Sequence, residues 1–382
     1  MLFRSVTGGT LTIEAGTIVK GENGSALAIT KDAKINAIGT ATAPIVFTSN
    51  KATPAPGDWG GVVLLGKATI NVTGGTNPIE GFATSFGERI VYGSATPNDA
   101  HDCGKLKFAR IEYGGFLLAP GNELNGLTIG GCGSATEIDF VQSHLGQDDG
   151  VEVFGGTVNL RHILITQPDD DGLDWDLGWT GKAQFVIVQQ KAGRGDKGFE
   201  ADNHPSAFDN LPRSAPEIWN ATLIGGDGLA ADKKQGGMHL RRGTAGKINN
   251  AIVAFWNQFG ADIDGAPSVG QFGTGLTITN TYFMKSTNAA AVWPAGFDVS
   301  NGTENDGGFD EVAMIGTGTN KVDIDVQLID AKNIAAPNFK PAVGSPVLAG
   351  CGTPPSGLDT TATFCGAIGA DDWTAGWAKF PD

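Results

Sequence analysis

The chain has 382 residues, of which 58 are glycine, and 26 Lys and Arg face 41 Asp and Glu, which gives a formal net charge of −15. This charge argues against a nucleic-acid-binding protein, because the summed field repels polyanions. Charged residues make up only 18% of the chain and hydrophobic residues 40%. This composition indicates many short strands and tight turns, not a helical bundle or a disordered chain. The sequence also predicts no membrane-spanning helix, because it lacks a run of about 18 apolar residues.

The first five residues, Met-Leu-Phe-Arg-Ser, lack the apolar core of a signal peptide. We expect residues 1–5 to be a non-native leader of a gene fragment, followed by a single domain at residues 6–382. Loop insertions are expected near residues 74–104, 203–216 and 285–320.

Further along the chain, short strands repeat between glycines. Gly150 begins Gly-Val-Glu-Val-Phe-Gly-Gly, and Gly172, 22 residues later, begins Gly-Leu-Asp-Trp-Asp-Leu-Gly. Related segments start at Gly198, Gly237 and Gly260. Units this small cannot bury an apolar face alone, so we predict an all-β, right-handed parallel β-helix, a solenoid with one stacked core. At roughly 25 to 30 residues per coil, the chain predicts on the order of 13 to 15 coils.

Several segments resemble a known family. They include Leu-Thr-Ile-Glu-Ala-Gly from residue 11, Ala-Pro-Ile-Val-Phe-Thr-Ser from residue 43, Gly-Asp-Trp-Gly-Gly-Val-Val-Leu-Leu-Gly from residue 57 and the ending Asp-Trp-Thr-Ala-Gly-Trp from residue 372. These segments resemble secreted bacterial surface proteins and lipoproteins with pectate-lyase-like β-helices. The resemblance runs from about residue 6 to the C-terminus. It implies the fold and a secreted or outer-surface location, but no reaction.

The four cysteines, Cys103, Cys132, Cys351 and Cys365, can pair in three ways. Cys351 and Cys365 bracket a turn-rich loop without histidine, which favours a disulfide over a zinc site. A bond between Cys103 and Cys132 requires that their coils be adjacent, which the spacing does not establish. A disulfide indicates an oxidising, extracytoplasmic compartment.

Alternation along the repeated strands predicts two outward columns of side chains. If Val151, Leu173, Phe199 and Met238 point into the core, one column contains Glu152, Asp174, Glu200 and His239, and the other Phe154, Asp176, Asp202 and Arg241. Strands of successive coils lie about 4.8 Å apart. Carboxylates so close need a cation or raised pKa values, and hard oxygen ligands suit Ca²⁺.

A second acidic cluster precedes the strands, in Gln-Asp-Asp-Gly from residue 147 and Asp-Asp-Asp-Gly from residue 169. Asp before Gly is ordinary turn chemistry, but stacked corners of this kind also suit Ca²⁺. The predicted Ca²⁺ ligands from both clusters are Asp148, Asp149, Asp170, Asp171, Asp174, Asp176, Glu200 and Asp202.

Three interpretations of these residues remain open. In the first, the protein is a Ca²⁺-stabilised binding or structural module that contacts polysaccharide through Asp174, Glu200, His239, Arg242 and Trp179. In the second, it is a Ca²⁺-dependent polysaccharide lyase or a glycoside hydrolase that uses Asp176, Asp202 and Arg241. In the third, Arg241 and Arg242 simply neutralise a solvated face. Trp175 is expected in the core, whereas Trp179 suits either the core or a sugar ring.

Overall fold

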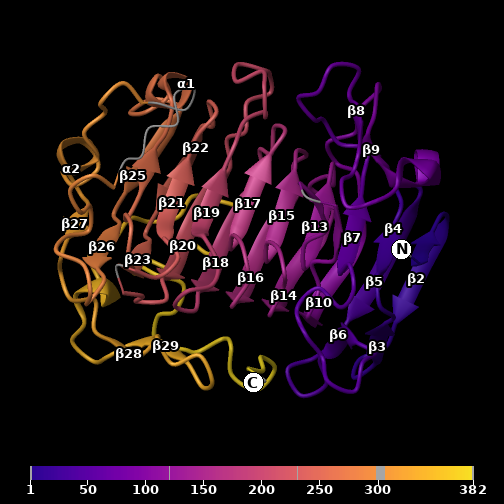
Figure 1. Cartoon of the computed structure of the whole chain (residues 1–382), viewed down its shortest axis with the longest axis horizontal. Helices are drawn as coiled ribbons and strands as arrows, with labels where there is room; N and C mark the ends of the chain where they lie inside the picture. Colours follow the sequence, from indigo (N-terminus) through magenta and orange to yellow (C-terminus); the bar gives the residue numbers. More distant parts are fainter. Residues whose placement is uncertain (1, 120, 230, 298–305, 381–382) are drawn as a thin grey trace.

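The structure is a computed structural model that describes residues 2–119, 121–229, 231–297 and 306–380 (Figure 1). Two long sheets dominate it, and their strands pair in parallel. The first sheet has nine strands, in the order β1 (Leu2–Val6), β4 (Ser25–Ile29), β7 (Val62–Leu65), β13 (Leu127–Gly130), β15 (Val151–Phe154), β17 (Leu173–Asp176), β19 (Lys197–Ala201), β21 (Gly236–Leu240) and β24 (Asp262–Ile263). Part of the segment expected to be a leader thus lies in the edge strand β1.

The second sheet has 14 strands. Its main path runs β2 (Gly9–Ile13), β5 (Ala33–Ile38), β10 (Gly104–Glu112), β14 (Glu137–His144), β16 (Asn159–Thr166), β18 (Lys182–Gln189), β20 (Glu217–Ile224), β23 (Ile252–Trp256), β26 (Tyr282–Lys285) and β27 (Lys321–Val322), joined by β3 (Ile18–Gly21), β6 (Ile45–Ser49), β22 (Gly246–Asn249) and β25 (Leu276–Thr279). The chain alternates between the sheets, so the predicted all-β parallel β-helix is confirmed.

The number of coils is smaller than the sequence predicts. The first sheet contains nine strands, against an expectation of 13 to 15 coils. The predicted number of coils was too high because it divided the whole chain by the length of one coil. The insertions and the last part of the chain lie outside the coils.

The core lies between the two sheets. Val151, Leu173, Phe199 and Met238 stand in register on successive strands of the first sheet and are fully buried. The predicted inward positions are therefore confirmed, and the residues between them lie on the outer face of the sheet.

The long strands of the second sheet bend where non-glycine residues adopt positive φ. These residues include Phe108, Phe140, His162, Phe185 and Asn220, with φ between 46° and 63°. We call these five residues the bend ladder. Its rings stack from coil to coil, with centroid distances of 4.4 Å for Phe108 and Phe140, 4.0 Å for Phe140 and His162, and 4.8 Å for His162 and Phe185.

The C-terminal segment, residues 326–380, runs back along the outer face of the second sheet (Figure 1, yellow). Its regular elements are an antiparallel pair, β28 (Leu328–Asp330) and β29 (Asn338–Pro341), and a short 3-10 helix η2 (Pro346–Leu348). Amide side chains of the sheet hold its backbone: Asn250 donates to the Gly352 carbonyl (2.7 Å) and Gln142 to the Lys379 carbonyl (2.7 Å).

The expected insertions lie between sheet strands. Residues 74–104 contain β8 (Thr76–Pro78), η1 (Thr84–Ile90) and β9 (Val91–Gly93), and a small hairpin, β11 (Leu117–Ala119) and β12 (Asn122–Glu123), follows β10. Residues 203–216 connect β19 to β20, α1 (Ala266–Val269) follows β24, and residues 285–320 contain α2 (Glu311–Met314). Residues 298–305 of that last insertion lie outside the described part of the chain.

The cysteines form two disulfides, Cys103 to Cys132 and Cys351 to Cys365. The second bond was predicted, and the first follows because Cys103 precedes β10 and Cys132 follows β13 on adjacent coils. Within the described ranges, no helix is both long and apolar enough to cross a membrane.

Candidate functional site

The first predicted column of polar side chains is present on the outer face of the first sheet. Glu152 pairs in register with Asp174, Asp174 with Glu200, and Glu200 with His239. The column then continues to Asp262 on β24. Period-two alternation and the repeat length therefore positioned these residues correctly.

The second column forms a network of ion pairs at the strand ends. Arg241 Nε lies 2.9 Å from Asp202 Oδ1, and the same guanidinium donates to Glu200. Arg242 Nη1 lies 2.9 Å from Asp202 Oδ2. Asp176, one coil before Asp202, accepts a hydrogen bond from the Leu177 N–H (2.5 Å). Arg241 is therefore committed to two carboxylates.

The corner carboxylates stack as predicted, and they also close the turns. Asp149 Oδ1 accepts from the backbone N–H of Asp171 (2.8 Å), and Asp171 Oδ1 accepts from the N–H of Lys197 (2.5 Å). Both side chains are buried. The same aspartates therefore stabilise the turns and bring carboxylates of successive coils together.

Eight carboxylates come close enough to share cations. Their oxygens form four groups of three, with atoms within 4.8 Å of one another: Asp148, Asp149 and Asp170; Asp149, Glu152 and Asp174; Asp170, Asp171 and Asp196; and Asp171, Asp174 and Glu200. We call these eight residues the acidic stack. Because Ca²⁺ binds oxygens at about 2.3 to 2.6 Å, ligands on opposite sides of one ion are separated by up to about 5 Å.

Burial makes the acidic stack costly to ionise. Burial and the charge of Asp170 raise the pKa of Asp148 to about 8. Burial also raises the pKa values of Asp149, Glu152, Asp171 and Asp174 well above the ordinary range of a carboxyl. Each shift is increased by neighbouring carboxylates, so the stack favours either protons or bound cations.

Asp174 lies near the centre of the stack and belongs to two of its four groups. Its Oδ1 atom is buried and has no hydrogen-bond partner among the described residues. A buried carboxylate oxygen without a donor is unfavourable, so this atom is directed at a place that a cation or a proton would occupy.

Glu200, at the far end of the stack, behaves in the opposite way. Burial would raise its pKa, but the nearby His239, whose Nδ1 lies 3.5 Å from Glu200 Oε1, and the charge of Arg241 lower it to about 2. His239 Nε2 lies 3.1 Å from Asp264, and the carboxylates of Asp264 and Glu200 outweigh burial and raise the pKa of His239 to about 9. The stack therefore ends in a charge-compensated cap of Lys197, His239 and Arg241.

A cavity of about 360 Å³ opens onto the acidic stack and gives solvent access to it. Its walls include Asp148 and Asp170 from the stack, together with Glu123, Asp169 and Lys233. The Lys233 ammonium lies 3.8 Å from Asp170 Oδ1.

Sequence reasoning missed three acidic residues near the stack. Asp196 forms part of it, and the repeat could have revealed Asp196, because Asp-Lys-Gly at 196 aligns with Asp-Asp-Gly at 170. Glu80 and Glu123 come from the insertions beside β13 and were not foreseeable from the repeat. Glu80 is exposed, and the neighbouring charge of Glu123 acts to raise the pKa of its carboxyl.

Three predicted site residues lie outside the acidic stack. Trp179 is fully buried and its Nε1 donates to the Val158 carbonyl (2.9 Å), so of its two expected places, the core and a sugar contact, it takes the core. In the described part of the chain, Asp176 and Asp202 join none of the four carboxylate groups. Asp202 instead pairs with the two arginines. Trp175 is buried, as expected.

The stacked parallel sheets and the polar columns on their outer face define a parallel β-helix protein. Residues 4–378 match the family described as the pectate-lyase-like beta helix domain, and the chain belongs to this family. No curated protein and no solved structure matches the chain.

Proposed function

We propose that the protein is an extracellular, Ca²⁺-stabilised β-helix module that binds polysaccharide, with the acidic stack holding the cations. The observation that carries the Ca²⁺ part is the buried, unpartnered Oδ1 of Asp174 inside two overlapping carboxylate groups. The pectate-lyase-like fold supports a polysaccharide-related role, and the two disulfides are compatible with an oxidising compartment.

The expected role of the cations is to hold coils together. Glu152, Asp174 and Glu200 belong to three successive strands, β15, β17 and β19. A Ca²⁺ ion between Glu152 and Asp174, or between Asp174 and Glu200, would bridge two coils. It would also replace the repulsion of buried like charges by attraction to a shared cation.

Lyase chemistry is less well supported, because its candidate base is not free. Arg241 is held by Glu200 and Asp202. Although burial disfavours the guanidinium, these two charges raise its pKa further above the ordinary value. A base that removes a proton from a sugar must first lose its own, which this environment opposes.

A glycoside hydrolase is the second candidate, favoured by one observation at Asp176. Burial and the charge of Asp202 raise the pKa of Asp176 to about 7, a value suited to a general acid at neutral pH. Asp176→Asn would abolish the release of new reducing ends from polysaccharide if this candidate were correct. Equal release by the variant and the parent would exclude it.

Calorimetric titration of the metal-free protein with Ca²⁺ tests the main proposal, with Mg²⁺ as the comparison ion. We expect Ca²⁺ to bind, and Asp174→Asn to weaken binding at least about tenfold. Asp325→Asn is the matched control, because Asp325 is exposed and outside the stack. No heat of Ca²⁺ binding by the parent protein, or equal affinity in both variants, would contradict the proposal.

A further inference from the structure

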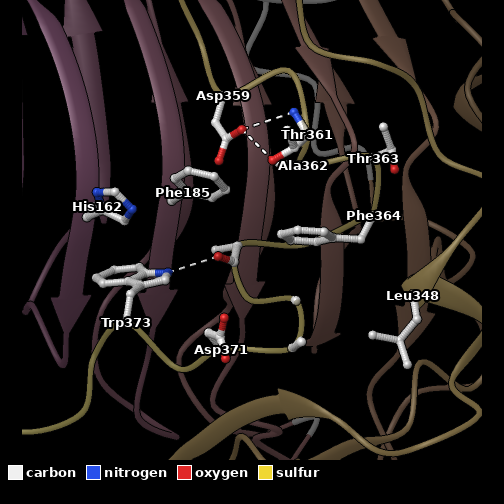
Figure 2. A pocket seen from close by; sticks show the side chains of 13 residues that line it. His162, Phe185, Leu348, Asp359, Thr361, Ala362, Thr363, Phe364, Asp371 and Trp373 are labelled. Carbon is white, nitrogen blue, oxygen red and sulfur yellow. Dashed lines mark hydrogen bonds between the residues drawn. The ribbon is translucent and has the colours of Figure 1, made fainter.

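A second cavity, unrelated to the acidic stack, lies between the bend ladder and the C-terminal segment. It has a volume of about 520 Å³, within the usual range for small-ligand sites. Figure 2 shows the side chains around it: His162 and Phe185 from the second sheet, and Asp359, Thr363, Phe364 and Trp373 from the C-terminal segment.

The two walls of this cavity are firmly joined. Gln184 Nε2 donates to the Asp359 carbonyl (3.1 Å), and the Asp359 N–H donates to Gln184 Oε1 (2.7 Å). Asn220 Nδ2 donates to the Phe364 carbonyl (2.7 Å). The disulfide between Cys351 and Cys365 closes the loop that carries Asp359 and Phe364. The cavity is therefore preformed, which lowers the entropic cost of binding a ligand.

Aromatic rings form the apolar surface of the cavity. The rings of Phe185 and Phe364 lie at 19° with centroids 6.4 Å apart, and the Trp373 ring stands at 66° to His162 with a centroid distance of 5.2 Å. Trp373 Nε1 donates to the Ala367 carbonyl (2.9 Å), which fixes its ring (Figure 2). Because Phe185 is buried and stacks on His162, the half-buried rings of Phe364 and Trp373 are the apolar surfaces open to the C–H face of a sugar.

Two carboxylates supply hydrogen-bond acceptors at the rim. One oxygen of Asp359 accepts from the N–H (3.0 Å) and the hydroxyl (2.6 Å) of Thr361, and its other oxygen points toward Phe185 (Figure 2). Hydrogen bonds from Thr361 lower the pKa of Asp359, so this carboxyl is ionised at neutral pH. Asp371 lies on another side of the cavity and is exposed. These groups accept hydrogen bonds from sugar hydroxyls and repel a uronate.

We propose that this cavity binds an uncharged pyranose unit of a polysaccharide. The proposal rests on the polysaccharide-binding part of the proposed function, names its sugar class and does not depend on Ca²⁺. A cationic ligand is less well matched, because Arg161 acts on the Asp359 carboxylate as a positive neighbour. Hydroxyl groups of Thr361 and Thr363 add neutral polar partners on the same wall.

The test measures binding of single oligosaccharides by calorimetry and saturation-transfer NMR, in Ca²⁺ and again in EDTA. The probes are cellohexaose, xylohexaose, mannohexaose, trigalacturonate and tetramethylammonium. Thr363→Arg fills the cavity from an exposed lining position, and Phe364→Ala removes a ring. Thr360→Arg adds the same charge at an exposed residue that does not line the cavity.

We expect at least one neutral oligosaccharide to bind the parent and Thr360→Arg equally, and both cavity variants at least about tenfold more weakly. Binding that persists in EDTA supports the cavity even if the Ca²⁺ proposal fails. Binding of trigalacturonate alone, unaffected by Thr363→Arg, would overturn the cavity proposal and leave the polysaccharide function standing. Binding of tetramethylammonium in place of the neutral sugars would also overturn it. Binding of no probe by the parent protein would overturn both.

Discussion

The carboxylate of Asp149 accepts a hydrogen bond from the backbone N–H of Asp171, 2.8 Å away and one coil further along the helix. Asp171 repeats this contact with the N–H of Lys197 on the following coil. Both contacts tie one turn to the next through a buried carboxylate whose pKa burial raises well above its usual range. The hydrogen bonds favour the ionised form and burial opposes it, and a bound cation would resolve this conflict.

Removal of Ca²⁺ is expected to lower thermal stability. A site that binds only the native protein contributes about 2.7 kcal/mol at a hundredfold excess of ligand over Kd. Differential scanning calorimetry in millimolar Ca²⁺ and in EDTA measures the effect. A midpoint that does not move between the two conditions would show that the acidic stack holds no stabilising cation.

The stabilisation of the fold by Ca²⁺ should increase with pH. Without metal, a half-buried carboxyl such as Asp148, with a pKa of about 8, is stabilising when protonated. Its contribution is present below the unfolded pKa near 4 and is lost as the pH rises through about 8. Ca²⁺ competes with these protons. The shift in midpoint on adding Ca²⁺ should therefore be larger at pH 8 than at pH 6, and an equal shift at both would contradict the assignment.

Glu311 at the start of α2 provides a pH-sensitive group outside the stack. Burial and the charges of Asp262 and Asp306 raise its pKa to about 8. The unfolded value is near 4.5, so its stabilising contribution is full at lower pH and is lost as the pH rises toward 8. Glu311→Gln keeps the acceptor for the Ile263 N–H and removes the titration. We expect urea unfolding to show a smaller loss of stability between about pH 5 and pH 9 in this variant than in the parent.

The C-terminal disulfide should stabilise both the fold and the cavity. Cys351 and Cys365 are separated by 14 residues, and closing a loop of this length contributes about 3 kcal/mol in the chain-entropy description. The double variant Cys351→Ser with Cys365→Ser should unfold at lower urea concentration. Non-reducing peptide mapping of the parent provides the check on the bond itself, since two free thiols there would exclude it.

Leu173→Asp tests which residues face the core. Leu173 is fully buried, so an unpaired charge at this position should cost several kcal/mol and prevent folding. The matched variant Asp174→Asn lies on the opposite face and should keep its circular dichroism spectrum. A folded Leu173→Asp protein would mean that the strand is shifted by one residue, which turns every side chain to the other face.

The parts of the structure that follow from local periodicity were predictable. Alternation and the 22-residue repeat placed Glu152, Asp174 and Glu200 in one column. Trp179 was not assignable, because it follows β17 in a turn, where alternation no longer defines a face. Contacts between segments far apart in sequence could not be predicted from periodicity either. Gln184, for example, meets Asp359 only because the C-terminal segment folds back along the second sheet.

The bend ladder shows a different limit. His162 and Phe185 adopt positive φ, a conformation that sequence patterns assign mainly to Gly, Asn and Asp. Stacking of these rings on their neighbours compensates for the backbone cost. The sequence therefore gave no sign of the bend or of the cavity built on it.

Arg241→Gln is expected to destabilise the protein, although one interpretation of the sequence placed Arg241 on a solvated outer face. Its side chain is 16% exposed and pairs with Glu200 and Asp202, which are 14% and 8% exposed. Removing one partner of a buried ion pair leaves uncompensated charges and typically costs about 3 to 5 kcal/mol. Asp202 retains its ion pair with Arg242, so Glu200 is the carboxylate most affected by the loss of the Arg241 charge.

Asp176→Asn is the matched comparison for Arg241→Gln. Burial and the charge of Asp202 raise the pKa of Asp176 to about 7, so the amide replaces a carboxyl that is already half protonated near neutral pH. Its stability should change little at pH 6 and should exceed that of the parent at pH 8, because the raised-pKa carboxyl loses its contribution as the pH rises. Urea unfolding of Arg241→Gln and Asp176→Asn at pH 6 and at pH 8 measures both effects on stability. If Arg241→Gln is as stable as the parent at both, the ion pairs are solvated and contribute no net stability, as surface pairs commonly do.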